Sequence, residues 1–112
     1  MKVSEFIKYG GYEVLTKSDY EDRDVSGCYI GDLLSWVMGR ASCDDVWITV
    51  MSNINIVAVA AMADVACIVL AEDVNVDDDI IKKANSQDII IVKSPKTAFE
   101  IGVDYYKFSS NA

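Results

Sequence analysis

The chain has 112 residues, 52% of them apolar, and its 18 acidic and 10 basic side chains give a formal net charge of -8. It contains no histidine, so the commonest general base at neutral pH and a common zinc ligand are both missing. The acidic balance argues against nucleic acid as a partner, because phosphate backbones are bound by Lys and Arg. A chain of this length closes one hydrophobic core, so we expect a single domain over residues 1–112.

Residues 1–24 are the least periodic part of the chain. We expect a short helix over 5–9, a break at Gly10 and Gly11, a strand over 12–15 and a polar loop over 16–24. The first residues contain no long apolar stretch, so they do not form a secretory signal. We therefore expect a cytoplasmic protein.

From residue 25 onward, short apolar runs alternate with longer stretches of helical spacing. Strands are predicted over 27–30, 46–50, 67–70 and 89–92. The last three are almost continuously apolar, which is typical of parallel strands covered on both faces. The predicted fold class is therefore α/β, a layered and mostly parallel sheet with helices on both faces.

Four helices are predicted between and after these strands, over residues 31–40, 54–64 and 77–85 and beyond Pro95. The helix at 54–64 is apolar all round, so either both its sides are covered or one side lies against a partner chain. The apolar stretch 54–71 contains Asp64 near its middle, so a buried helix and strand explain it better than a membrane span.

The acidic run over residues 72–79 carries oxygen side chains at alternate positions, as a calcium loop does. Counted from Asp73, however, its sixth and twelfth positions hold Asp78 and Ala84 in place of Gly and Glu. We expect a solvated loop with an aspartate at the helix cap. No metal or cofactor is predicted.

The candidate ligand site lies at the carboxyl ends of the parallel strands, where open α/β sheets bind ligands. Its residues are hydroxyl, amide and lysine side chains that follow two of the strands: Ser52, Asn53, Asn55, Ser94, Lys96 and Thr97. Together with the backbone amides at a helix start, they suit a small anionic metabolite. Such residues are also ordinary in turns, so the structural alternative stays open.

The three cysteines, Cys28, Cys43 and Cys67, form no CxxC pair, and we expect reduced, mostly buried thiols. The strings GxxxxGK[ST], GxGxxG and GxSxG are absent from the sequence. Cys28 is the strongest candidate nucleophile, since it precedes a predicted helix, although a nucleophile needs a lowered thiol pKa. A small cysteine- or carboxylate-dependent enzyme is therefore kept as the alternative function.

Two aromatic side chains lie away from the apolar sides of their helices, Trp36 and Tyr106. Exposed large aromatics mark interfaces, although packing under a neighbouring loop is the alternative. We expect a homodimer formed through one of these helix faces.

Three strings carry a family resemblance: GCYIGDLLSWVM at 27–38, SNINIVAVA at 52–60 and ACIVL at 66–70. They resemble the DRTGG domain, a small α/β module found beside CBS domains and similar to the amino-terminal domain of HPr kinase/phosphorylase. The resemblance covers residues 25–108. The family's Gly-Asp-Arg turn is replaced here by Met51, Ser52 and Asn53.

The resemblance implies a non-catalytic regulatory or ligand-sensing module that acts through self-association or a partner protein. The kinase activity of the HPr enzyme belongs to a separate P-loop domain, and the P-loop string does not occur here. The resemblance therefore implies no kinase activity for this chain.

Overall fold

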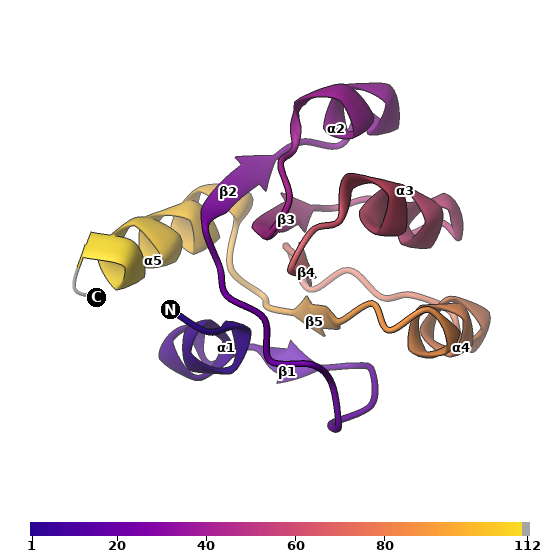
Figure 1. Cartoon of the computed structure of the whole chain (residues 1–112), viewed down its shortest axis with the longest axis horizontal. Coiled ribbons are helices and arrows are strands. Elements are labelled where there is room, and N and C mark those ends of the chain that lie inside the picture. The colour runs from indigo at the N-terminus through magenta and orange to yellow at the C-terminus, as the bar shows by residue number, and fades with distance from the viewer. Residues whose placement is uncertain (111–112) are drawn as a thin grey trace.

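A computed structural model describes residues 1–110 and arranges them as a sheet between two layers of helices (Figure 1). The strands are β1 (Glu13–Val14), β2 (Gly27–Ile30), β3 (Asp45–Thr49), β4 (Cys67–Leu70) and β5 (Ile91–Lys93). The helices are α1 (Val3–Gly10), α2 (Leu34–Arg40), α3 (Asn55–Ala63), α4 (Asp78–Ser86) and α5 (Ala98–Ser110).

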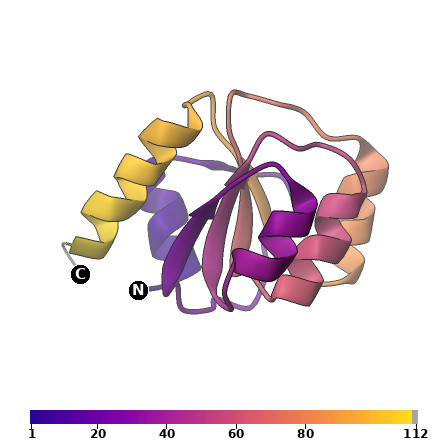
Figure 2. The same cartoon turned by 90° about the horizontal axis from the view of Figure 1, so that it is seen from above.

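The sheet has the strand order β1-β5-β4-β3-β2. Strands β2 to β5 are parallel and lie side by side in chain order, while β1 pairs antiparallel with β5. The connecting helices α2, α3 and α4 cover one face of the sheet, and α1 and α5 cover the other (Figures 1 and 2). The predicted α/β class, with a mostly parallel sheet and helices on both faces, is confirmed.

The core consists of two apolar layers, one on each face of the sheet. Along β3, Val46 and Ile48 pack toward the layer of α1 and α5, whereas Trp47 packs into the layer of α2, α3 and α4. Strand β4 alternates in the same way and is buried at every position. Apolar cover on both faces explains why these strands appear as unbroken apolar runs in the sequence.

Several predicted boundaries differ from the observed ones, and local hydrogen bonds explain two of these differences. Residues 31–33 are not helical, because Gly31 donates its N–H to the Ile48 carbonyl and the Asp32 carboxylate accepts from Thr49 and Val50. Strand β5 begins two residues late, because the N–H of Ile89 bonds to the Ala84 carbonyl at the end of α4.

The apolar helix α3 buries only one side. Ile56, Val57, Val59 and Ala60 are buried, whereas Ala58, Ala61 and Met62 are exposed. Cover on both sides is therefore wrong, and a partner chain against the exposed side stays a prediction. No helix within residues 1–110 has the length and apolar content needed to cross a membrane.

Candidate functional site

Half of the predicted ligand site is exposed at the start of α3. Ser52, Asn53 and Asn55 are all exposed there. The Asn53 Oδ1 atom accepts the Asn55 N–H at 2.9 Å, so the Asn53 side chain holds the turn that leads into the helix. The first turn of α3 carries no acidic residue, unlike those of α1, α4 and α5. This end of α3 therefore keeps its partial positive charge.

The other half of the predicted site forms hydrogen bonds within its own turn. Ser94 is buried, and its Oγ accepts the Lys96 N–H at 3.1 Å. Thr97 and Glu100 form a reciprocal capping box at the start of α5, with bonds of 3.0 and 3.1 Å. These side chains hold the turn between β5 and α5.

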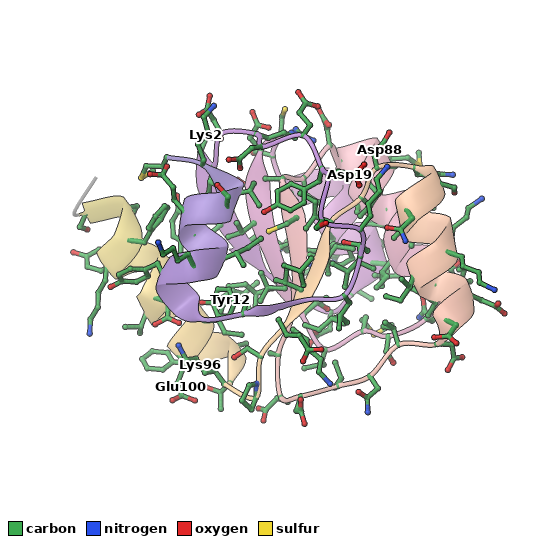
Figure 3. The ribbon with its side chains drawn as sticks, turned by 90° about the horizontal axis from the view of Figure 1, so that it is seen from below. Lys2, Tyr12, Asp19, Asp88, Lys96 and Glu100 are labelled. Carbon is green, nitrogen blue, oxygen red and sulfur yellow. The ribbon has the colours of Figure 1, made fainter. Side chains whose placement is uncertain are left out.

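Lys96 lies beside Tyr12 and the start of α5 (Figure 3). Its ammonium forms an ion pair with Asp104 at 2.7 Å and donates to the Gly10 carbonyl at 3.2 Å. Tyr12 donates to the same Asp104 carboxylate at 2.8 Å. Burial, followed by this bond to Asp104, raises the pKa of Tyr12 far above its ordinary value. Lys96 therefore links α1 to α5.

The two halves of the predicted site are separated in the sheet by β4. The strand order runs from β2 to β5 without a reversal, so no topological switch point lies among these strands. The segment after β4 instead bonds to the segment after β5, through Glu72 N–H to the Lys96 carbonyl and Asp73 N–H to the Ser94 carbonyl. Ligand binding at these residues stays a prediction, and residues 52–55 are its exposed part.

The acidic run lies over the loop before α4. The Lys93 ammonium lies 3.2 Å from the Asp73 carboxylate and 2.8 Å from the Asn75 amide oxygen. Asp77 occupies the cap position of α4, but its side chain makes no cap hydrogen bond. Within residues 1–110, no group of three or more Cys, Asp or Glu side chains is placed to hold a metal ion.

The three thiols lie in different environments: Cys67 is buried, Cys28 is half-buried and Cys43 is exposed, so the expectation of mostly buried thiols is wrong for Cys43. Burial, with a smaller effect of Asp45, raises the pKa of Cys28 to about 11. A hydrogen bond to Asp64 raises the pKa of Cys43. Both shifts favour the thiol over the nucleophilic thiolate.

We expect Cys28 to react slowly with iodoacetamide at neutral pH. Because the thiolate is the reactive form, its rate should rise about tenfold per pH unit until the pH approaches 11. The folded-state pKa also exceeds the ordinary value of 9.0, so this thiol's contribution to stability should decline as the pH rises from 9 to about 11. Mass spectrometry of alkylated peptides measures the rate. Rapid, selective labelling of Cys28 near neutral pH would contradict this expectation and support the enzyme alternative.

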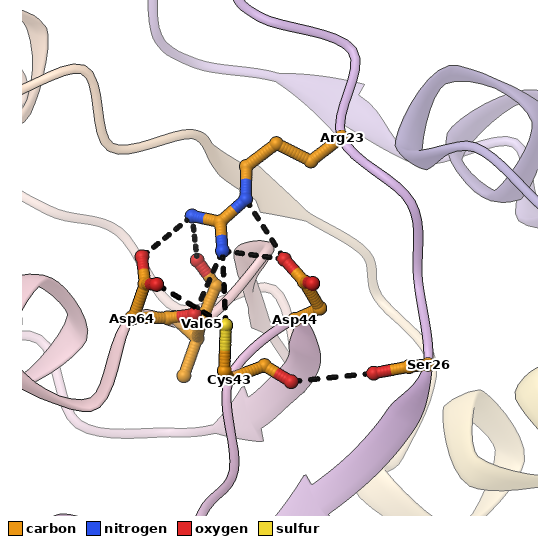
Figure 4. A network of polar contacts seen from close by, with 6 residues as sticks. All are labelled: Arg23, Ser26, Cys43, Asp44, Asp64 and Val65. Atoms are coloured by element: carbon orange, nitrogen blue, oxygen red, sulfur yellow. Dashed lines mark hydrogen bonds and ion pairs between the residues drawn. The ribbon is translucent and has the colours of Figure 1, made fainter.

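A network around Arg23 joins the loop before β2 to the starts of β3 and β4 (Figure 4). The guanidinium bonds to the Asp44 carboxylate, pairs with Asp64 at 3.0 Å, and donates to the carbonyls of Asp64 and Val65. Cys43 donates to the Asp64 carboxylate at 3.1 Å. No sequence motif pointed to this network, because its members are far apart along the chain.

The two predicted interface aromatics are exposed, Trp36 at 51% and Tyr106 at 70%. The Arg40 guanidinium stacks on the Trp36 ring at 3.8 Å. Beside Tyr106, a groove of about 520 Å³ runs between β2 and α5 and is lined without any charged side chain. Its walls include Cys28 and Ile30 of β2 and Phe99 of α5.

The fold is similar to that of a solved structure, whereas the sequence matches no known family. No family model matches the sequence, and no curated protein matches it. Among solved structures, the chain is similar to the CBS and DRTGG domains of the regulatory region of Clostridium perfringens pyrophosphatase, complexed with the activator diadenosine tetraphosphate. The TM-score is 0.68 at 12% sequence identity, over 89% of this chain and 44% of that one.

The chain thus has a small α/β fold with a mostly parallel sheet enclosed by two helical layers. More narrowly, it has a DRTGG-like fold, as the sequence resemblance predicted. It spans less than half the length of the regulatory-region chain that it matches.

Proposed function

We propose that this chain is a regulatory module that acts through contact with another protein chain and catalyses no reaction of its own. The observation that carries the proposal is a set of exposed apolar side chains on edge strand β2 and on the segments beside it on the two faces of the sheet. They come from β2 itself and from the two elements beside it: Ile30, Leu33, Trp36, Phe99 and Tyr106. We call this set the β2 apolar surface. Ile30, Phe99 and Tyr106 line the same groove, and apolar side chains that lie together in this way mark interaction sites, whereas single exposed ones are ordinary.

The DRTGG-like fold supports a regulatory role, since the structure it resembles belongs to the regulatory region of an enzyme. The raised thiol pKa values of Cys28 and Cys43 disfavour the cysteine-dependent enzyme. We place the module in the cytoplasm, where thiols are kept reduced.

The association claim predicts that Tyr106→Glu weakens assembly, because a charge would have to be desolvated in the interface. Met62→Glu is the matched control, since Met62 is 72% exposed but lies on α3. In sedimentation velocity, we expect wild type and Met62→Glu to sediment as larger species than Tyr106→Glu. Identical masses for all three proteins would contradict the claim.

A second candidate function, sensing of a small anionic metabolite, rests on the acid-free first turn of α3 beside Ser52, Asn53 and Asn55. Backbone amides at a helix start bind phosphate. The pyrophosphatase region is complexed with a phosphate-rich nucleotide, diadenosine tetraphosphate, and we propose this ligand class here. In this proposal Ser94, Lys96 and Thr97 fix the neighbouring turn more than they contact the ligand.

Sensing predicts that diadenosine tetraphosphate raises the thermal unfolding midpoint of the wild type. Ser52→Ala and Asn53→Ala should reduce that rise, whereas Ser18→Ala, an exposed serine in the loop after β1, should keep it. Asn53→Ala also removes the side-chain hydrogen bond to the Asn55 N–H, so the ligand-induced change is compared, not the midpoint itself. The absence of any rise in the wild type would contradict sensing of this ligand class and leave the association claim in place.

A further inference from the structure

The two edges of the sheet differ in how they are protected. Edge strand β1 has two residues, one of them the exposed Glu13. Edge strand β2 has four residues, Gly27–Ile30, with neither charge nor proline, and within residues 1–110 it pairs only with β3. Natural sheets usually protect an edge with charges, proline, bulges or very short strands. Strand β2 carries neither a charge nor a proline, so its outer edge is open to pairing with another strand.

The β2 apolar surface extends over both faces of the sheet beside this edge. Phe99 and Tyr106 lie on α5, which covers one face of the sheet (Figure 1). On the other face, Leu33 is the residue that precedes α2, and Trp36 lies within that helix. A lone extended peptide could pair with the edge but would leave both sets uncovered. A partner with helices on both faces of its own sheet would cover them, and a second copy has that arrangement.

We propose that β2 pairs antiparallel with β2 of a second copy, which makes one continuous sheet through both chains. A two-fold axis perpendicular to the sheet keeps like faces together, so α5 lies beside the partner's α5 and α2 beside the partner's α2. This inference rests on the association claim above and adds the identity of the partner and the means of contact.

The available area favours a second copy, and the uncharged groove removes one cost of bringing two acidic chains together. From the ordinary size of aromatic side chains, the β2 apolar surface exposes on the order of 600 Å² per copy. Two copies then bury about 1,200 Å², the lower end of the range for specific interfaces. Each copy carries a net charge of -8, but the groove between β2 and α5 has no charged lining, so no groove carboxylate loses its water.

Hydrogen–deuterium exchange of the β2 segment tests the pairing directly. In the wild type, we expect exchange over residues 27–30 to slow about tenfold between low and high micromolar protein, because new interchain bonds protect the amides. Ile30→Lys and Leu33→Lys place a charge beside the edge at half-exposed positions on different faces, and each should abolish this slowing. Met62→Lys is the control and should keep it. Circular dichroism confirms that each variant is folded.

Sedimentation velocity on the same samples separates the outcomes. A wild-type dimer whose β2 exchange does not change with concentration would overturn edge pairing and leave association through the helices. A wild-type monomer at every concentration would overturn both the edge pairing and self-association.

Discussion

Replacing Trp47 with alanine is expected to lower the free energy of unfolding by about 4 kcal/mol, a value typical of large core truncations. The Trp47 side chain is fully buried under α2 and α3, among residues such as Val37 and Ile56. Its indole N–H donates to the Gly31 carbonyl at 2.9 Å, so the truncation also removes one of the bonds that hold the turn after β2. Urea unfolding followed by circular dichroism measures the loss.

Trp36→Ala is the matched control, because Trp36 is the other tryptophan and is half exposed. We expect it to change the free energy of unfolding by less than about 0.5 kcal/mol, as for ordinary surface positions. Its effect should fall on association. Equal stability losses in the two variants would contradict the assignment of Trp47 to the core and Trp36 to the β2 apolar surface.

Arg23→Ala is expected to lower the free energy of unfolding by about 2 kcal/mol, reduced from the value for a fully buried pair because the network is partly solvated. The substitution leaves the carboxylates of Asp44 and Asp64 without their shared cation, and the Val65 carbonyl without its donor. Lys17→Ala removes an exposed ion pair with Asp88 and should leave stability nearly unchanged.

Arg23→Ala should also change how the free energy of unfolding depends on pH in acid. A hydrogen bond from Cys43 and then the charge of Arg23 lower the pKa of Asp64 below its ordinary value of 3.8. Because the folded-state pKa is depressed, this carboxylate stabilises the fold above its unfolded pKa and loses that contribution as the pH falls. Without Arg23, the free energy of unfolding should therefore fall less as the pH is lowered below about 3.8. An unchanged acid dependence would contradict a role for Arg23 in holding this carboxylate.

Much of the fold follows from local patterns in the sequence. Strand β4 was predicted at its observed bounds, because cover on both faces makes each of its residues apolar. Helix α1 ends where Gly11 adopts the left-handed conformation, at the predicted glycine break. The exposure of Trp36 and Tyr106 also followed from helical spacing.

The candidate site was less predictable, because its contacts join distant parts of the chain. Lys96, one of the predicted ligand residues, pairs with Asp104 and reaches the Gly10 carbonyl, 86 residues away. Arg23 reaches the Asp64 carbonyl across 41 residues. Neither partner can be selected from local spacing, since many acidic side chains were available to each cation.

The central claim is that the β2 apolar surface becomes covered when the protein associates. Carbene footprinting of the wild type at low and high micromolar concentration tests it most directly, with mass spectrometry locating the labels. We predict that labelling of Trp36, Phe99 and Tyr106 falls at high concentration, while that of Met62 on α3 does not change. If the labelling of Trp36, Phe99 and Tyr106 stays the same at low and high concentration, as that of Met62 does, the claim is contradicted.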